Sequence, residues 1–482
     1  MIKISLTLYY QREFMREFDG DDLDGQDFEE VLKRFENMIN TGTSAYFDAD
    51  ELEEIVEYYF QWLNYEMVKK ALDFGLKQFP FSSALKIKQA QYLSSQHFTQ
   101  EALALLNEVE QTESHNFDLF IARGYIYSQM GLGEQAIENF KKALPLAENK
   151  DEVYLALGVE FLNEDKADDA IFYLKKALKV NPRNEVALNE LSLCYDITGK
   201  AEEAISFFID YIDEFPYSYY AWFNLGLAYN RFGLYEKAIE AYDYAIAINE
   251  KFGSAYFNKA NSLAQLEQYR EAIEVYKETF KYENKEAATY YYIGECFENL
   301  QEFEEALINY NRCIKLDETY ADAWLGIGVC LDALNRLTEG VHYVKRALEI
   351  NPNEAEYWYV FAQIQQKLGF QEESALAYQR VIELEYDEFD VWLDYARLLD
   401  EAGYYTECIE VLSEGIKHYP DCAELYYRQG VVLVENGKRL EGLESLAKAL
   451  ELNFNKYTDI FEYAPELKED NQILELINSF KN

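Results

Sequence analysis

The hydrophobic and polar positions of the chain repeat with a period of 34 residues, as in YAWFNLGLAYNRFGLYEKAIEAY, Tyr220 to Tyr242. Apolar residues recur there at intervals of three and four, the spacing of one buried helix face. With position 1 set at Ala49, the skeleton returns twelve times through Lys456 without insertion or deletion. Positions 8 and 20 are small in nearly every copy. The pattern predicts two antiparallel helices per repeat, which approach closely where these small side chains meet.

Turn residues mark the ends of the predicted helices. We expect one turn near position 15 and a second at positions 32 to 34. Five of the seven prolines fall at position 32, where the second helix must stop because proline has no backbone N–H to donate. They are Pro80, Pro182, Pro216, Pro352 and Pro420. Residues 49–456 are therefore predicted to form twelve helix pairs.

Two segments flank the repeats. Residues 1–48 are acidic and include DFEEVLKRFENMIN, whose apolar residues have helical spacing and predict a helix that caps the first repeat. Residues 457–482 are predicted to end in a second capping helix, since the open core of a terminal repeat needs a cover. One face of that helix would carry Ile473, Leu474, Ile477 and Phe480.

One acidic stretch of the N-terminal segment, DGDDLDGQDFEE, resembles a calcium-binding loop. Counted from Asp19, Leu23 takes position 5 of the loop, where an oxygen ligand is needed, and Gly25 takes position 7 instead of 6. We interpret the stretch as a solvated acidic linker before a helix, and we predict no metal site.

The 34-residue pattern resembles the tetratricopeptide repeat family, whose repeats carry a bulky residue, Leu, Gly and Tyr in the first helix, then Ala, an aromatic residue, Ala and Pro. The terminal repeats depart most, with Lys86 at position 4 and Phe454 at position 32. The resemblance covers residues 49–456. It implies an all-α fold, a right-handed superhelical α-solenoid of antiparallel helix pairs, with a concave groove that binds protein partners.

The charge balance narrows the choice of partner. The chain has 44 Lys and Arg against 89 Asp and Glu, a net charge of -45. Such a field repels nucleic acid and favours a basic protein or peptide, although acidity also keeps a long molecule soluble. No apolar run reaches the roughly 18 residues of a membrane helix, and the N-terminus lacks a small-residue cleavage site. We expect a cytoplasmic protein without membrane insertion.

Candidate chemistry is sparse. The four histidines form no HExxH and no pair at i, i+4, and no phosphate-binding glycine loop or GxSxG is present. The six cysteines have no CxxC and no zinc-ligand spacing, and we expect buried thiols in a reducing compartment. Nothing outside the repeats is long enough for a catalytic domain. We therefore predict a protein that is not an enzyme and needs no cofactor.

Positions 2, 5, 9 and 12 form a stripe beside the buried positions 4, 7, 8 and 11, and in the resembled family this stripe lines the groove. Position 5 is apolar or aromatic in ten of twelve copies. These side chains either anchor a partner or pack against neighbouring repeats. Position-6 amides of some relatives hold a peptide backbone. The candidate partner-binding residues are Ile121, Leu155, Phe223, Asn224, Arg231, Phe257, Asn258, Asn261, Tyr291, Tyr292 and Tyr359.

The leading hypothesis is a scaffold that binds a peptide or helix of a partner protein, with acidic ends selecting a basic ligand. The acidic residues are Asp50, Glu53, Glu54 and Glu57 at one end, and Asp390, Asp394, Asp400 and Glu401 at the other. The basic clamp that relatives use on a terminal carboxylate is missing. Its positions hold Asn189, Leu193, Ser254, Ala288 and Tyr292. The alternatives are a regulatory subunit of an enzyme or transcription complex, and an enzyme with an unrecognised site.

Overall fold

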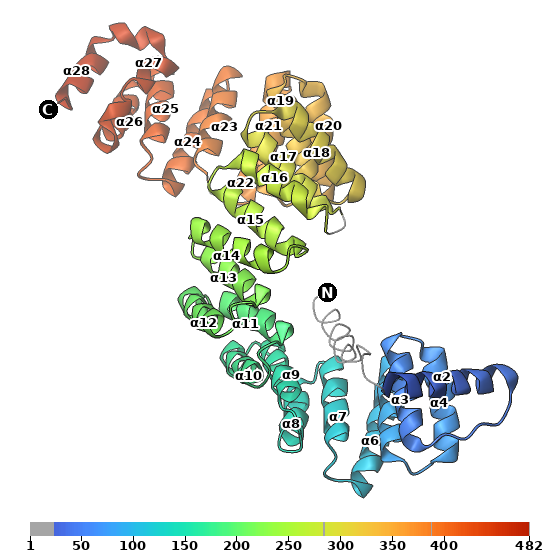
Figure 1. The fold of residues 1–482 in the computed structure, drawn as a ribbon. Coiled ribbons are helices and arrows are strands. Elements are labelled where there is room, and N and C mark those ends of the chain that lie inside the picture. Colours follow the sequence, from blue (N-terminus) through green and yellow to red (C-terminus); the bar gives the residue numbers. More distant parts are fainter. Residues whose placement is uncertain (1–23, 283–284, 387, 482) are drawn as a thin grey trace. The chain divides into compact units, whose positions relative to one another are not determined.

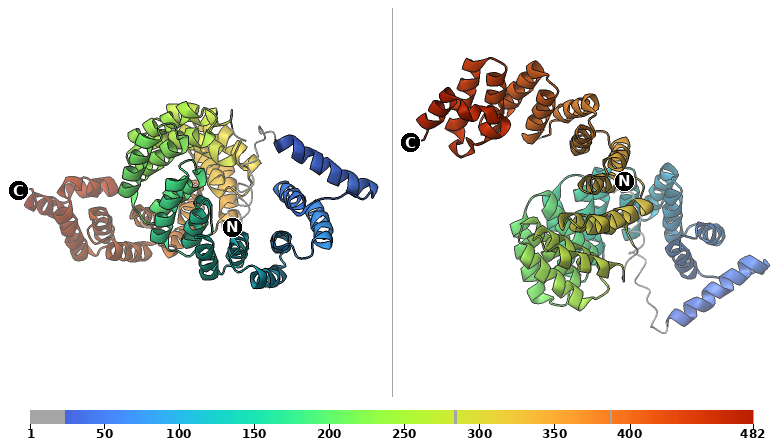
Figure 2. Two further views of the ribbon diagram at one scale, coloured as in Figure 1. Left: turned by 60° about the horizontal axis from the view of Figure 1, so that its bottom comes forward. Right: turned by 90° about the horizontal axis from the view of Figure 1, so that it is seen from above.

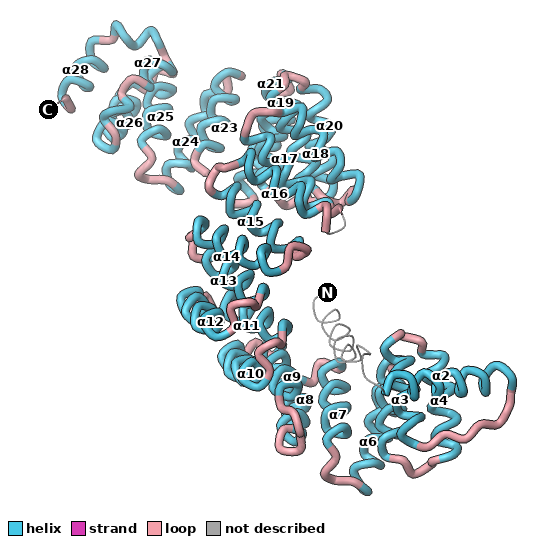
Figure 3. The backbone as a smooth tube through the Cα atoms, in the orientation of Figure 1, coloured by secondary structure: helices cyan, strands magenta, loops and turns pink. Residues whose placement is uncertain are grey.

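The computed structural model describes residues 24–282, 285–386 and 388–481, and in these residues the regular structure is entirely helical (Figures 1 and 3). Within each compact part of the chain, consecutive helices pack against one another in chain order, which makes the fold an α-solenoid (Figure 2). The chain divides into two compact units, residues 1–255 and 256–482. Each unit is described by itself below. The first five residues of the candidate calcium loop, Asp19 to Leu23, lie outside the described residues, whereas Asp24 to Glu30 are helical.

The first unit contains α2 Asp24–Thr41, α3 Ala49–Gln61, α4 Tyr65–Gln78, α5 Ser83–Ser95, α6 Thr99–Thr112, α7 Phe117–Gln129, α8 Gly133–Ala143, α9 Asp151–Asn163, α10 Ala167–Val180, α11 Glu185–Ile197, α12 Ala201–Glu214, α13 Tyr219–Arg231 and α14 Tyr235–Ile248. Helix α15, Gly253–Gln265, contains the division between the units.

The second unit continues with α16 Tyr269–Thr279, α17 Ala287–Asn299, α18 Phe303–Leu316, α19 Ala321–Ala333, α20 Leu337–Ile350, α21 Ala355–Leu368, α22 Gln371–Glu383, α23 Asp390–Glu401, α24 Tyr405–His418, α25 Ala423–Glu435, α26 Arg439–Leu452, η1 Phe454–Lys456, α27 Asp459–Tyr463, η2 Pro465–Glu469 and α28 Asn471–Ser479. The first helix of every pair begins at position 1 of the 34-residue frame except α23. That helix begins one residue late, after a turn in which Glu385 has a φ of 56°.

The predicted turn at position 15 is confirmed by the backbone. All twelve residues at this position have positive φ, between 53° at Leu63 and 84° at Gly369. Six of them are glycine, which adopts this conformation without a Cβ clash, and six are not, Gln301 among them. The turn geometry is therefore set by the packing of the two helices, since it persists where the local residue opposes it.

Small residues at positions 8 and 20 do mark close approach of the two helices, as expected. In the pair α19 and α20, a Cβ on Gly340 would lie 3.1 Å from the carbonyl oxygen of Gly328. The structure adds a second reason for a small position 8, because the position-24 side chain lies directly on it. A Cβ on Gly226 would lie 2.4 Å from the ring of Tyr242.

Three tryptophans at position 4 fix the turn that precedes their own helix. The indole Nε1 of Trp222 donates to the carbonyl oxygen of Pro216 at 2.9 Å, and Trp358 donates to that of Pro352 at 2.8 Å. Trp324 makes the same bond to Glu318 at 3.0 Å. Each bond joins position 4 to position 32 of the preceding repeat, so the loop between repeats is held by a buried-face aromatic residue.

The flanking helices pack on the terminal repeats of their own units. In α2, Phe35 is fully buried, with its ring 5.7 Å from that of Phe47. In α28 and directly after it, Ile473 and Ile477 are buried, whereas Leu474 and Phe480, which the sequence places on the same covering face, are exposed. The C-terminal segment is more divided than the single helix that the sequence predicts, because α27 and η2 precede α28.

Candidate functional site

The first-helix stripe, meaning positions 2, 5, 9 and 12, is a surface whose aromatic members are partly occupied in packing. The ring of Phe223 lies 5.9 Å from Tyr242. Phe257 lies 5.7 Å from Tyr276, and Tyr291 lies 5.8 Å from Tyr310. In each case position 5 contacts position 24 of the same repeat. These rings are half-buried, so they contribute to the repeat core and also reach the surface.

The other candidate residues of the first unit differ widely in exposure. Ile121 is buried and Leu155 is partly buried against the core. Asn224 is only 1 % exposed, and its Nδ2 donates to Asn189 Oδ1 at 3.1 Å and to the Tyr220 carbonyl at 2.9 Å. Arg231 is exposed and pairs with Asp196 at 3.3 Å. The amide donors of Asn224 are thus committed within the chain, and a peptide-holding role for this residue stays a prediction.

In the second unit, the candidates near α16 and α17 form one aromatic and polar group. Asn261 accepts a hydrogen bond from the Tyr276 hydroxyl at 2.5 Å. The ring of Tyr292 stacks on Tyr276 at 6.1 Å and contacts Phe257 at 5.6 Å. Asn258 is half-buried, and its backbone carbonyl accepts a hydrogen bond from the Ser262 hydroxyl at 3.1 Å. These residues are brought together as the sequence predicts for neighbouring repeats, with their polar groups engaged inside the chain.

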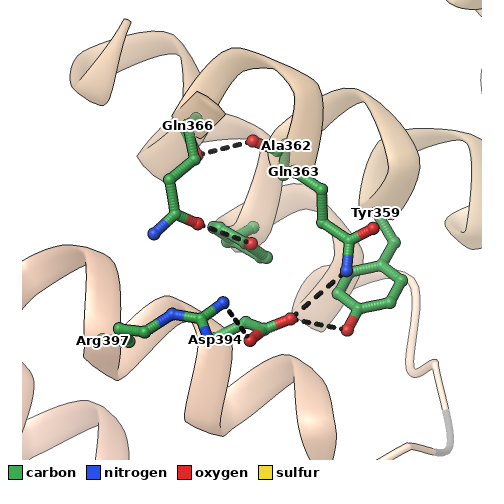
Figure 4. Close-up of polar contacts among 8 residues, drawn as sticks. Tyr359, Ala362, Gln363, Gln366, Asp394 and Arg397 are labelled. Carbon is green, nitrogen blue, oxygen red and sulfur yellow. Dashed lines mark hydrogen bonds and ion pairs between the residues drawn. The ribbon is translucent and has the colours of Figure 1, made fainter. Parts of the chain in front are cut away.

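Tyr359 has a polar environment that Figure 4 shows in close-up. Its hydroxyl donates to Asp394 Oδ2 at 2.7 Å, and Gln363 Nε2 donates to the same oxygen at 3.3 Å. Arg397 pairs with the other carboxylate oxygen at 2.6 Å. Burial, and then the bond to Asp394, raises the pKa of Tyr359 above its ordinary value of 10. The ring is therefore held by both apolar and charged contacts.

The acidic end that the sequence places at Asp394 and Asp400 is largely neutralised inside the chain. Asp394 has Arg397, and Asp400 pairs with the buried Arg428 at 2.6 Å. At the other end, Glu57 pairs with Lys88 at 3.2 Å. These carboxylates attract a basic ligand less strongly than the sequence alone suggests, because a neighbouring cation already compensates their charge.

A less compensated acidic group, which the sequence analysis did not single out, lies on α17, α19 and α21. It comprises Glu295, Glu298, Asp322 and Glu356 at stripe positions 9, 12, 2 and 2, and we name it the α17–α21 acidic face. Within the described part of the chain none of the four makes an ion pair. A search of each stripe position for acidic residues without a basic residue at the neighbouring stripe positions would have found this group.

Burial first, and then repulsion between neighbouring carboxylates, raises the pKa values of the glutamates on this acidic face. Partial burial raises the pKa of Glu295, and the charges of Glu298, Asp322 and Glu356 raise it further. Burial and then Asp322 raise the pKa of Glu356. Burial also raises the pKa of Glu298, against the bond it accepts from the Tyr310 hydroxyl at 2.7 Å. A cation placed here would relieve the repulsion and favour the ionised carboxylates.

The described residues contain no group of three or more His, Cys, Asp or Glu arranged to hold a metal ion. Across residues 24–282, 285–386 and 388–481, every helix is too short or too polar to cross a lipid bilayer. Five cysteines are buried and Cys422 is partly buried. Burial raises the pKa of the Cys194 thiol to about 12, which disfavours the reactive thiolate.

Family comparison defines the class of protein. Five models of the tetratricopeptide repeat match residues 117–150, 155–219, 219–252, 257–321, 300–364 and 389–432, which together exceed half of the chain. The chain belongs to the tetratricopeptide repeat family, whose members act as protein-interaction scaffolds and bind protein or peptide partners. Among curated proteins no match was found.

Solved structures of repeat proteins resemble the chain at low identity. YrrB, a TPR protein with an unusual peptide-binding site, is 20% identical over 38% of this chain and 95% of its own, with a TM-score of 0.33. The Cut9–Hcn1 hetero-tetramer of the APC/C is 16% identical over 89% of this chain and 98% of the matched chain, with a TM-score of 0.43. MamA from Desulfovibrio magneticus RS-1 is 19% identical over 35% and 96%, with a TM-score of 0.33.

Proposed function

We propose that this protein is a non-enzymatic scaffold that binds a basic segment, extended or helical, of a partner protein along the first-helix stripe of α17, α19 and α21. The observation that carries the proposal is the α17–α21 acidic face, where Glu295, Asp322 and Glu356 make no ion pair within the described residues. A lysine-rich or arginine-rich segment supplies the missing charge. The same field disfavours nucleic acid.

Half-buried tyrosines support the proposal from the apolar side. Tyr291 lies one helical turn before Glu295 in α17, and the centre of its ring lies 5.1 Å from that of Tyr320. Tyr359 is the corresponding residue of α21. Rigid aromatic surfaces beside carboxylates suit basic side chains, because the ring face attracts a cation while the carboxylate accepts its hydrogen bonds. Of the other candidates, Phe223, Phe257 and Tyr292 remain predicted contacts.

The packing of the position-5 rings determines which variants can test the function. Alanine at Phe223 or Phe257 would remove core contacts as well as surface, so lost binding could reflect lost folding. Neutralising acids on the stripe avoids this difficulty. Glu295→Gln with Glu356→Gln removes two charges and keeps side-chain size. Glu304→Gln with Glu372→Gln, both exposed on second helices, is the matched control.

The experiment is affinity purification of the full chain followed by mass spectrometry and cross-linking. We expect the stripe variant to lose at least one partner whose cross-linked segment is basic, while the control keeps it. Amide hydrogen exchange on both variants verifies that the helices remain protected. Retention of every partner by the stripe variant, with the helices intact, contradicts the proposal. A cross-linked segment that is acidic or neutral contradicts it as well.

A further inference from the structure

A cavity of about 500 Å³ lies in the first unit between two successive inter-repeat turns, and we name it the turn pocket. One wall is the turn from α10 to α11, with Pro182, and the other is the turn from α12 to α13, with Pro216 (Figure 1). These are the only position-32 prolines in consecutive repeats. The volume is in the range of small-ligand sites and suits one large side chain of a partner.

The walls of the turn pocket are held in place by hydrogen bonds. Trp222 Nε1 donates to the Pro216 carbonyl at 2.9 Å, and the Tyr211 hydroxyl donates to the Pro182 carbonyl. The Ser218 side chain accepts from the Ala221 N–H at the start of α13 at 3.3 Å. Because proline restricts φ and the carbonyls are bonded, the pocket is preformed, and little conformational entropy is lost on binding.

The lining combines aromatic rings with carboxylates. Phe215 and Leu188 contribute apolar lining, and Tyr217 and Tyr219 contribute two further rings. Glu185 and Glu214 contribute the two carboxylates, and the Tyr219 hydroxyl donates to Glu185 at 3.2 Å. Rings with carboxylates at their edge select a flat cation, since a guanidinium stacks on a tyrosine while its N–H groups bond a carboxylate.

The turn pocket also adjoins the first-helix stripe. Tyr220, at stripe position 2, belongs to the lining, and its ring lies 4.5 Å from that of Tyr219. The ring of Phe252 lies 5.2 Å from Tyr220 and 4.9 Å from Phe223. A continuous aromatic path therefore leads from the pocket to a stripe residue of α13. A segment lying on the stripe of the first unit can reach the pocket with one side chain.

We propose that the turn pocket binds an arginine side chain of a partner protein segment. That this arginine belongs to a partner protein rests on the proposed function. Binding of an arginine side chain in the turn pocket does not depend on it. Arg183 stands at the exposed rim and is the basic residue among the described lining. Its charge opposes an arriving guanidinium, so removing it should strengthen binding.

The test is methyl NMR on the full chain, with the Leu188 methyl groups as reporters and acetyl-arginine methylamide as the probe. We expect saturable shifts of the Leu188 resonances with arginine, and shifts at least three-fold weaker in affinity with acetyl-lysine methylamide. Acetyl-citrulline methylamide, which has the same shape without the charge, should cause none. Equal responses to arginine and citrulline, equal affinities for arginine and lysine, or no response to arginine overturn the proposal.

Variants locate the response. Tyr217 is 84% exposed, so Tyr217→Ala should leave the fold intact and weaken arginine affinity three-fold or more. Phe81→Ala is the matched control, because Phe81 occupies the same position 33 of another turn and is 90% exposed. Glu214→Gln should weaken binding and Arg183→Gln should strengthen it. Affinity that is unchanged in Tyr217→Ala and Glu214→Gln places the probe elsewhere and overturns the assignment.

The two proposals fail separately. If arginine does not bind the turn pocket but the Glu295→Gln, Glu356→Gln variant still loses a basic partner, only the pocket assignment is wrong. If arginine binds the pocket and the stripe variant keeps every partner, the pocket stands as an arginine site and the proposed function of the acidic face is wrong.

Discussion

Phe223 in the first unit and Tyr359 in the second occupy the same position 5 of their repeats, yet their surroundings differ. Both rings contact a position-24 tyrosine, at 5.9 Å for Phe223 and 6.1 Å for Tyr359. Phe223 then packs on Phe252 at 4.9 Å, whereas the Tyr359 hydroxyl bonds Asp394 at 2.7 Å. Tyr359 also has an aromatic third neighbour, Tyr386 at 6.0 Å, so the two surroundings differ in the added carboxylate.

The difference shows how a repeat fold separates packing from recognition. The contact between positions 5 and 24 recurs because every pair has the same geometry. The third contact varies because it lies toward the surface, where many side chains are compatible with the same backbone. The hydroxyl of Tyr359 binds a carboxylate, which the phenyl ring of Phe223 cannot do, so the two residues present different chemistry at the surface. Two substitutions test this comparison directly, and three more test a partly buried carboxyl group of the first unit and a turn that both units share.

The largest expected effect comes from Phe223→Ala. Loss of the contacts with Tyr242 and Phe252 should lower the stability of α13 and α14 by about 2 kcal/mol, below the cost for a fully buried phenylalanine because the ring is half-buried. Amide hydrogen exchange measures this locally, as repeat arrays open in parts. Phe232→Ala, at a residue 50% exposed, is the control. Equal losses in the two variants would show that Phe223 is a surface residue.

Tyr359→Phe removes one hydroxyl and keeps the ring. The lost bond to Asp394 should cost about 1 kcal/mol in the protection of α21 and α23, since the carboxylate keeps Gln363 and Arg397. Tyr405→Phe, at a residue 46% exposed, should change protection by a few tenths of a kcal/mol or less. If protection in Tyr359→Phe equals that of the parent, the hydrogen bond from Tyr359 to Asp394 does not stabilise the second unit, and the polar difference between Tyr359 and Phe223 has no energetic effect.

The stability of the first unit should depend on pH through the carboxyl group of Glu152. Burial, then the charges of Asp151 and Asp118, raises the pKa of Glu152 to about 7 from 4.5, and its Oε1 has no hydrogen-bond partner. The folded state therefore holds the proton more tightly, and this stabilisation is complete below pH 4.5 and lost as the pH rises through 7.

Glu152→Gln tests that assignment. The variant should be more stable than the parent by about 1 kcal/mol at pH 8, with the advantage vanishing at pH 4.5, as measured by exchange in α9 at both pH values. Glu134→Gln, at an exposed residue of α8, should show no such change with pH. If the difference in stability between the parent and Glu152→Gln is the same at both pH values, ionisation of Glu152 does not destabilise the folded state.

The last test, which includes the smallest expected effect, concerns a feature that both units share, the positive φ of the residue at position 15. Gln301→Gly should stabilise α17 and α18 by about 0.5 kcal/mol, because relief of the strained φ of 59° exceeds the added entropy of the unfolded chain. Gly233→Ala should destabilise α13 and α14 by about 1 kcal/mol, although no atom lies within 4 Å of the new Cβ. Urea unfolding of both variants checks the opposite signs.

Much of the candidate site followed from register. The 34-residue frame placed Tyr291, Tyr292 and Phe257 near one another before any contact was known. It did not indicate that Asn224 is buried with its donors engaged, because the burial of position 6 differs between repeats, as in the buried Asn224 and the half-buried Asn258. Nor did it show that Asp400 is paired, since its ion pair with Arg428 joins residues of different helices.

The sequence by itself determined the period, the helix starts and the turns of this protein, because small residues, prolines and apolar spacing act locally and recur in every repeat. Only the tertiary structure decided which carboxylates remain uncompensated and where a pocket opens between the turns at Pro182 and Pro216. Those features depend on distances between side chains far apart in the chain. Such distances are set by how the helices pack, and the pattern of residue types along the chain does not give them.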